Sequence, residues 1–292
     1  MCAVETVNQL LTQMLAHADP AQVEGLSRFF KTGPGQYGEG DKFLGIKVPV
    51  TRAVVKECWK PTGFDDLEEC IGSDYHEVRL AALLALVEIF KHAKRLPVKP
   101  AMTSGCQPAM ATCPATTGSS CPATTQASCP APTGHLLREQ CIDFYLSHTD
   151  RINNWDLVDL SCYPLLGEWL LDKDRSILYE LARNGKTLWE QRIGIESTMT
   201  FIRHGQLDDT FAIADILLSH PHDLIHKAVG WLLREAGKRD KAALEAYLKK
   251  PERRGAGQRP VYKTMPRTML RYAIEIFPEA ERQTYLTGTL VR

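Results

Sequence analysis

Residues 80–90 read LAALLALVEIF, and the spacing of their apolar side chains indicates how the chain folds. Leu80, Leu83, Leu84 and Val87 stand at positions i, i+3, i+4 and i+7, which places them on one face of an α-helix. The run is too short and too interrupted to span a membrane. It therefore predicts a helix that packs inside a helical protein.

The same helical spacing recurs along most of the chain, and no stretch alternates with the period of two expected for a half-buried strand. Short polar or Pro/Gly turns separate the periodic segments, which is typical of antiparallel helical hairpins. We expect an all-α fold, an α-solenoid of stacked antiparallel HEAT-like hairpins, as a single domain over residues 1–292. The expected helices cover about 3–17, 20–31, 49–60, 63–72, 74–94, 135–148, 154–171, 173–184, 187–204, 207–219, 221–238, 240–249 and 265–276.

One segment interrupts this pattern. Residues 101–134 contain no charged or aromatic side chain, and they include the tandem repeat CPATTGSS (113–120) and CPATTQAS (121–128). Such a composition cannot form a core, so we expect a low-complexity, disordered insertion between two hairpins. A metal site is the alternative, but the cysteines lack the short chelating pairs of zinc sites, and we expect no metal at Cys106, Cys113, Cys121 and Cys129.

Charge and cysteine content suggest the environment of the protein. The 35 basic and 35 acidic residues cancel, but residues 249–271 carry eight bases against one acid, which is compatible with phosphate binding. The N-terminus has no basic region followed by an apolar core, and nine cysteines are scattered without an export signal. We therefore expect a cytoplasmic protein with free thiols and no membrane contact.

A candidate site begins at the sequence Asn154-Trp155-Asp156-Leu157-Val158-Asp159. Trp155 and Asp159 are four residues apart, so an aromatic ring and a carboxylate share one helix face. Asp156 is interpreted as a favourable charge in the first helical turn. Alternatively, Trp155 is a residue of the hydrophobic core and Asp159 is an acid on the surface.

Two further features point to nucleic acid. Lys227, Trp231, Arg234 and Lys238 stand at i, i+4, i+7 and i+11, and cations interleaved with an aromatic on one face are typical of a DNA-binding helix. Arg192, near the start of its helix, is a candidate phosphate contact, with a structural ion pair as the alternative. The basic C-terminal stretch adds two candidate DNA contacts, Arg267 and Arg271.

The chain resembles the DNA alkylation repair family, the AlkD-like HEAT-repeat glycosylases of alkylated purines. The resemblance is carried, in the order of the family, by Phe43-Leu44-Gly45-Ile46 with Pro49, Trp155-Asp156-Leu157-Val158-Asp159, Trp189-Glu190-Gln191-Arg192, the stretch His226–Glu235 and the stretch Met265–Ala273. It implies that Trp155, Asp159 and Trp231 form the active constellation and that Arg192 contacts the DNA backbone. The long insertion is the departure from the family pattern.

The resemblance also implies a reaction. A purine alkylated at N3 or N7 is already cationic and leaves readily, so the protein would stabilise the developing sugar cation and guide water to it, without flipping the base into a deep pocket. This function belongs to base excision repair: a hydrolase acting on alkylated double-stranded DNA, monomeric and without a cofactor. The alternatives are a non-catalytic HEAT scaffold that binds a protein ligand and a silent family member that binds DNA structures.

Overall fold

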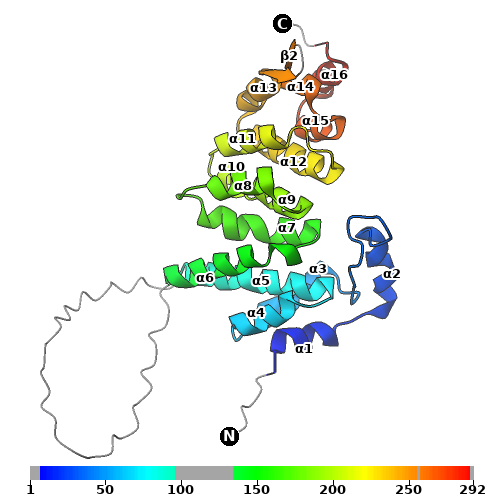
Figure 1. Ribbon diagram of the computed structural model, residues 1–292, viewed down its shortest axis with the longest axis vertical. Helices are drawn as coiled ribbons and strands as arrows, with labels where there is room; N and C mark the ends of the chain where they lie inside the picture. Colours follow the sequence, from blue (N-terminus) through cyan, green and yellow to red (C-terminus); the bar gives the residue numbers. More distant parts are fainter. Residues whose placement is uncertain (1–6, 96–133, 255–256, 290–292) are drawn as a thin grey trace, which may run out of the picture.

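The computed structural model describes residues 7–95, 134–254 and 257–289, and its helices are stacked along the longest axis of the molecule from α1 at one end to α16 at the other, with α2 beside the stack (Figure 1). The described part is mostly helical, which confirms the all-α prediction. The helices are α1 (Gln9–Ala16), α2 (Pro20–Phe29), α3 (Val48–Cys58), α4 (Phe64–Ile71), α5 (His76–Ala93), α6 (Gly134–Ser147), α7 (Trp155–Cys162), α8 (Ser176–Asn184), α9 (Leu188–Glu196), α10 (Met199–Arg203), α11 (Asp208–Leu217), α12 (Asp223–Arg239), α13 (Lys241–Lys249), α14 (Val261–Thr264), α15 (Arg267–Ala273) and α16 (Glu279–Thr287).

Helix α5 is the centre of the N-terminal half. It is buried around most of its circumference, with Leu80, Leu83 and Leu86 almost fully enclosed, and it packs against α3, α4, α6 and α7. A helix that is apolar on nearly all sides needs neighbours on all sides. The stretch 80–90 therefore forms the helix that the sequence predicts, and it holds the layers on either side of it together.

Two segments predicted as single helices are broken in the structure. The segment 154–171 changes at η2 (Tyr163–Gly167), a π-helical turn that contains Pro164, because proline has no N–H to continue the regular ladder. The segment 187–204 divides into α9 and α10 at Ser197 and Thr198, which are buried and donate their hydroxyls to backbone carbonyls of α9.

The prediction that the chain has no strand is wrong near the C-terminus. β1 (Pro251–Arg254) and β2 (Gly257–Pro260) pair antiparallel, with Pro251 opposite Pro260 and Arg254 opposite Gly257. Strands of four residues, each with a proline at its outer end, are too short to show an alternating pattern. The helices α14 and α16 were also not predicted.

A tight turn places the N-terminal loop over the start of α5. Gly45 has φ +89°, and a Cβ there would lie 1.9 Å from the Asp19 carbonyl oxygen, so only glycine fits. The Glu77 carboxylate accepts hydrogen bonds from the N–H groups of Leu44, Gly45 and Ile46 at 2.9, 2.9 and 3.0 Å. The loop between α2 and α3 is thereby fixed beside the start of α7.

The remaining predictions about the chain fall partly outside the described residues. The predicted disordered insertion at 101–134, with its four cysteines, lies there except for Gly134, the first residue of α6. The cysteines that the structure does describe, Cys58, Cys70, Cys141 and Cys162, are buried free thiols. Among the described helices, none has the length and apolar character needed to cross a membrane.

Candidate active site

The first turns of α7 form one wall of a cavity of about 390 Å³. The Asn154 side chain accepts a hydrogen bond from the Trp155 N–H at 2.9 Å and so fixes the start of the helix. Trp155 and Asp159, one turn apart, both line the cavity, as their spacing predicts. Most of the other lining side chains are apolar and come from α2, α3, α5 and the loop between α2 and α3.

Phenylalanines from α2 and the following loop cover part of Trp155. The Phe30 ring stacks on the indole with centroids 5.5 Å apart and an interplanar angle of 23°, and Phe29 meets it edge-on at 5.9 Å. Phe43 stacks on Phe30 in turn, with centroids 5.1 Å apart. Phe29 is 60% exposed although it is large and apolar. The sequence prediction assigned no role to Phe29 and Phe30, and their adjacency at the end of a helix was the only signal.

Arg192 of α9 holds the Asp159 carboxylate from the interior side. The guanidinium donates from Nε to Oδ1 at 2.8 Å and from Nη2 to Oδ2 at 2.9 Å, so the two planar groups meet at two points. The Asp159 side chain is 18% exposed and that of Arg192 is 7% exposed. Asp159 therefore cannot rotate freely, and what remains of its accessible surface faces the cavity.

A second carboxyl group lies beneath this pair. Glu196 is fully buried one helical turn after Arg192, and its Oε1 is 2.5 Å from Arg192 Nη2, without the angles of a hydrogen bond. Burial raises the pKa of Glu196 well above its ordinary value, against the opposing effect of the Arg192 charge. Although burial alone would lower the pKa of Arg192, Glu196 and Asp159 raise it. One cation is thus shared between two acids.

The predicted contact between Arg192 and the DNA backbone stays a prediction, because this structure directs the Arg192 side chain into the protein. Besides its contacts with Asp159 and Glu196, Arg192 donates from Nη1 to the Leu224 carbonyl oxygen of α12 at 2.8 Å. Its donors are directed into the protein, and its side chain is almost completely enclosed. The structural ion pair, which the sequence left open as the alternative, is what forms.

Asp156 lies in the first turn of α7, as predicted, and it also belongs to a buried network of charges. It is 3% exposed, and its Oδ2 lies 2.9 Å from His76 Nε2, while His76 Nδ1 lies 2.9 Å from Asp41 Oδ2. Arg79 pairs with Asp41 on the other side. Burial alone would lower the pKa of His76, but the hydrogen bonds with Asp156 and Asp41 raise it to about 9. Asp156 is a link in a buried network as well as a residue of the first turn of α7.

Helix α12 carries the predicted stripe of cations, and each of them has an acidic partner. Lys227 pairs with Asp223 at 2.8 Å, and Lys238 pairs with Glu235 at 2.7 Å. Arg234 contacts both Glu235 and Glu275. The charge of the stripe is therefore locally compensated, and a DNA phosphate would have to replace a carboxylate at each position.

Trp231 is half-buried on α12 and does not line the cavity of Trp155 and Asp159. Tyr37, in the loop between α2 and α3, is close to both regions: burial raises the pKa of its hydroxyl, and Trp155 and the charge of Lys227 act against that shift. The structure therefore brings together two of the three predicted catalytic side chains, and the third is on α12, which packs against the other side of α9. The candidate DNA contacts Arg267 and Arg271 are exposed on α15, where Arg267 donates to the Leu286 carbonyl oxygen at 2.8 Å.

Within the part of the chain that the structure describes, no group of three His, Cys, Asp or Glu side chains is arranged to hold a metal ion. The chemistry available at the cavity is that of a fixed carboxylate beside an aromatic wall. Such a group can stabilise positive charge and orient a water molecule.

Comparisons with known proteins indicate the family of the chain. The family model described as DNA alkylation repair enzyme matches residues 10–106 and 128–277. Among solved structures, a predicted DNA alkylation repair enzyme from Enterococcus faecalis superposes with a TM-score of 0.58 and 14% identity, covering 89% of this chain and 97% of that one. No match was found among curated proteins.

The fold and the site define an all-α protein with a carboxylate and an indole at one cavity. The chain belongs to the DNA alkylation repair enzyme family. The resemblance seen in the sequence is thus confirmed at the level of the family.

Proposed function

We propose that this protein is a DNA glycosylase that hydrolyses the N-glycosidic bond of purines alkylated at N3 or N7 in double-stranded DNA. The family supports a role in the repair of alkylated DNA. The observation that carries the finer assignment is the Asp159 carboxylate, fixed by Arg192 and placed beside Trp155 at one cavity. The stacked helix pairs in Figure 1 support the HEAT-like solenoid as the architecture.

The reaction needs little help at the leaving group. An N3- or N7-alkylated purine is cationic, and it becomes neutral when it takes the electron pair of the bond to C1′. The sugar is left as an oxocarbenium-like cation. Water then adds to C1′ and gives up a proton, so the products are a free base and an abasic deoxyribose.

Asp159 would stabilise the sugar cation and orient the attacking water. A charge that is fixed before the reaction stabilises developing opposite charge without reorganisation, and removal of one such group typically costs about 10²–10³ in rate. Arg192 compensates part of the negative charge, but it also fixes the direction in which the carboxylate points. Trp155 would offer its ring to the same cation at about 0.5–2 kcal/mol.

The substrate would approach along the face that carries α7, α12 and α15. Phe30 already covers one face of the Trp155 indole, so a deoxyribose would pack against the remaining surface of that ring. Trp231, Lys227, Arg234, Lys238, Arg267 and Arg271 remain proposed contacts to the DNA, and the paired cations would exchange their carboxylates for phosphates. We propose that the protein acts as a monomer, without a cofactor, in the cytoplasm.

The test is the variant Asp159→Asn, which keeps the shape of the side chain and removes its charge. We expect the single-turnover rate of 7-methylguanine release from methylated duplex to fall about 10²–10³-fold. The affinity for the same duplex should change little, because the proposed phosphate contacts lie elsewhere. Release is measured by chromatography of the free base, and affinity by fluorescence anisotropy.

Asp209→Asn is a matched control. Asp209 also pairs with an arginine, Arg175, and its side chain is 16% exposed, against 18% for Asp159. It lies on α11, and it does not line the Trp155 cavity. The assigned role fails if Asp159→Asn releases base at the wild-type rate, or if both variants lose activity equally.

A further inference from the structure

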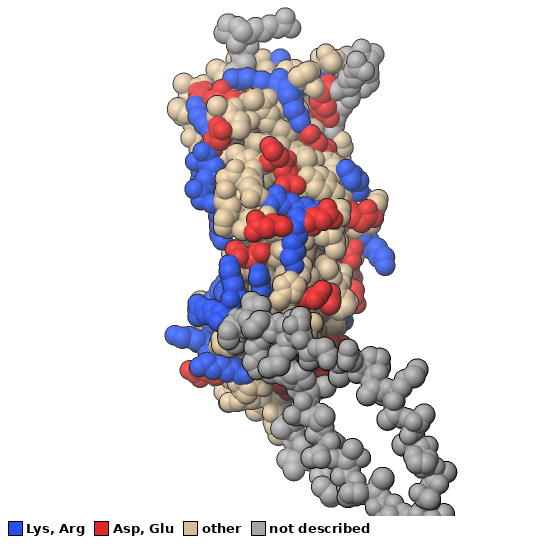
Figure 2. All heavy atoms as spheres, turned by 90° about the vertical axis from the view of Figure 1, so that its left-hand side faces the viewer, with Lys and Arg blue, Asp and Glu red and all other residues tan. Residues whose placement is uncertain are grey.

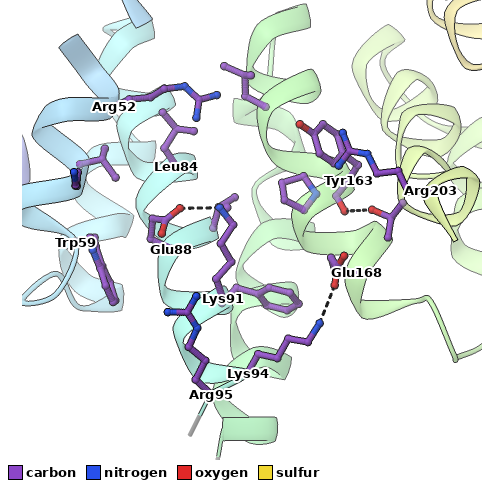
Figure 3. Close-up of a pocket in the computed structure, with 17 residues that line it drawn as sticks. Arg52, Trp59, Leu84, Glu88, Lys91, Lys94, Arg95, Tyr163, Glu168 and Arg203 are labelled. Atoms are coloured by element: carbon purple, nitrogen blue, oxygen red, sulfur yellow. Dashed lines mark hydrogen bonds and ion pairs between the residues drawn. The ribbon is translucent and has the colours of Figure 1, made fainter. Parts of the chain in front are cut away.

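A second cavity, of about 760 Å³, lies between α3, α5, η2 and α10, and none of the site residues described above lines it (Figure 3). Six cations line it against two acids, Glu88 and Glu168. The cations are Arg52, Lys56, Lys91, Lys94, Arg95 and Arg203. The formal charge of the lining is therefore +4 (six minus two), in a protein whose total charge is zero.

The acids compensate only part of this charge. Lys91 pairs with Glu88 at 2.8 Å, and Lys94 approaches Glu168 to 3.3 Å, as the dashed lines in Figure 3 show. Both lysines remain more than half exposed. Arg52, Lys56 and Arg95 are exposed, and the described residues offer them no carboxylate within salt-bridge distance.

The cations are spread along helices and are not gathered around one point. Arg52 and Lys56 are one turn apart on α3. Lys91 is in the last turn of α5, Lys94 and Arg95 follow its end, and Arg203 lies opposite on α10 (Figure 3). Between them lies an apolar floor that includes Leu84, Val87 and Leu160. Figure 2 shows lysine and arginine side chains gathered in the lower half of the face that it draws. An extended polyanion fits such a lining better than a single phosphate does.

This basic cavity continues from the candidate active site. Leu160 lines both cavities, and α3 and α5 pass from one to the other, with Pro49 and Leu80 at the first and Arg52 and Leu84 at the second. From Leu80 to Lys94 an α-helix rises about 21 Å. A DNA strand advances about 3.4 Å per nucleotide, so this distance corresponds to roughly six nucleotides.

We propose that the basic cavity is a second DNA contact, which binds backbone phosphates of the strand about four to eight nucleotides to one side of the lesion. The proposal rests on the proposed function for the position of the lesion. Trp59 and Tyr163 also line the cavity, beside the cations that would contact the phosphates. Arg203 already lies over the Tyr163 ring, 4.7 Å from its centroid.

The experiment compares two double variants, Arg52→Ala/Lys56→Ala and Lys91→Ala/Arg95→Ala, with the wild type, all as the full chain. The DNA is a set of three duplexes, each with one 7-methylguanine. The first has long arms on both sides of the lesion, the second has its 5′ arm cut to three base pairs, and the third has its 3′ arm cut to three base pairs. Anisotropy gives the affinity and its salt dependence, and single-turnover release at saturating protein gives the chemical rate.

We expect the wild type to bind more weakly when one particular arm is cut. On the long duplex, the slope of log affinity against log salt concentration should be less steep by about two for each double variant, one for each lost phosphate contact. On the duplex that lacks the relevant arm, the variants should match the wild type. The rate at saturation should stay unchanged, because the altered residues lie outside the Asp159 cavity.

Lys241→Ala/Lys249→Ala is the control for loss of charge alone, since it removes two exposed lysines from α13. The proposal is overturned if the two double variants of the basic cavity keep the wild-type DNA affinity and salt slope. It is also overturned if they lose the same affinity for every duplex, whichever arm is cut. It is also overturned if an acidic peptide or inorganic phosphate binds the wild type but not the double variants, while the double variants bind DNA as tightly as the wild type does. Absence of base release by the wild type would contradict the proposed function, whereas the arm dependence of binding would still test the basic cavity.

Discussion

Arg192 lies between two carboxyl groups, and its charge keeps the Asp159 side chain in place at the wall of the cavity. The contacts with Asp159 at 2.8 and 2.9 Å and with Glu196 at 2.5 Å engage one enclosed guanidinium. Loss of one partner from a buried ion pair is strongly destabilising, because the charge that remains has neither solvent nor a counter-ion. Arg192 should therefore act on stability as well as on the direction of Asp159.

The variant Arg192→Met tests this role. We expect the free energy of unfolding to fall by about 3–5 kcal/mol, because two acids lose their shared cation. The second change Glu196→Gln should recover part of the loss, since the amide replaces a group whose charged form is disfavoured by burial. Denaturant unfolding of the wild type, the two single variants and the double variant gives the coupling. A stability unchanged by Arg192→Met, or no coupling with Glu196→Gln, would instead indicate a surface role.

At the scale of the residue, the sequence predicted the pairing of Trp155 with Asp159 but not the environment of Arg192. Two positions four residues apart on one helix share a face from local geometry alone. Whether an arginine faces DNA or the interior depends on which helices pack beside it, and Asp159, Glu196 and Leu224 come from three helical segments. Phe29 and Phe30 were missed for the same reason, since their contact with Trp155 spans more than 120 residues.

At the scale of the element, a network of buried charges holds the loop between α2 and α3 against α5 and α7. His76, the first residue of α5, lies between Asp41 of the loop and Asp156 of α7, at 2.9 Å from each. Its folded-state pKa is about 9, above the ordinary 6.5. Protonated His76 therefore stabilises the fold, and this contribution is complete below about pH 6.5 and is lost as the pH rises through about 9.

The pH dependence of unfolding tests this link. We expect the wild type to lose roughly 3 kcal/mol between pH 6.5 and pH 9.5, at about 1.4 kcal/mol for each unit of pKa difference. His76→Gln should be less stable at pH 6 and show a flatter dependence on pH. His17→Gln, at the exposed end of α1, should follow the wild-type curve. A wild-type curve that is flat over this range would contradict the assigned network.

The element boundaries show which signals the sequence contains. Helix α5 was predicted from apolar spacing, because a long segment with helical periodicity contains in its own sequence the signal for its conformation. The interruption at Pro164 carries a visible signal, the lack of an N–H, but the hairpin β1–β2 does not, because four residues cannot establish a period. The sequence alone gave no sign of the role of Gly230: a Cβ there would lie 2.6 Å from that of Tyr272, so the glycine lets α12 and α15 pack closely.

At the scale of the whole molecule, the order of the helices could be predicted from the sequence, but the distribution of charged side chains over their surface could not. The total charge is zero, and the predicted cations on α12 are paired with acids, whereas a group of cations that is only partly compensated lies between α3, α5 and α10. Distant parts of the chain supply that group, from Arg52 to Arg203. Only the fold brings them together.

The central claim is that the protein hydrolyses the bond between an alkylated purine and its sugar. The most direct measurement is incubation of the wild-type protein with N7-methylated duplex in water enriched in oxygen-18, followed by mass spectrometry of both products. The account predicts free 7-methylguanine and an equal amount of abasic deoxyribose that carries one oxygen-18 at C1′, trapped by reduction before it exchanges with the solvent. DNA that is bound but releases no base above the rate of spontaneous loss would contradict it.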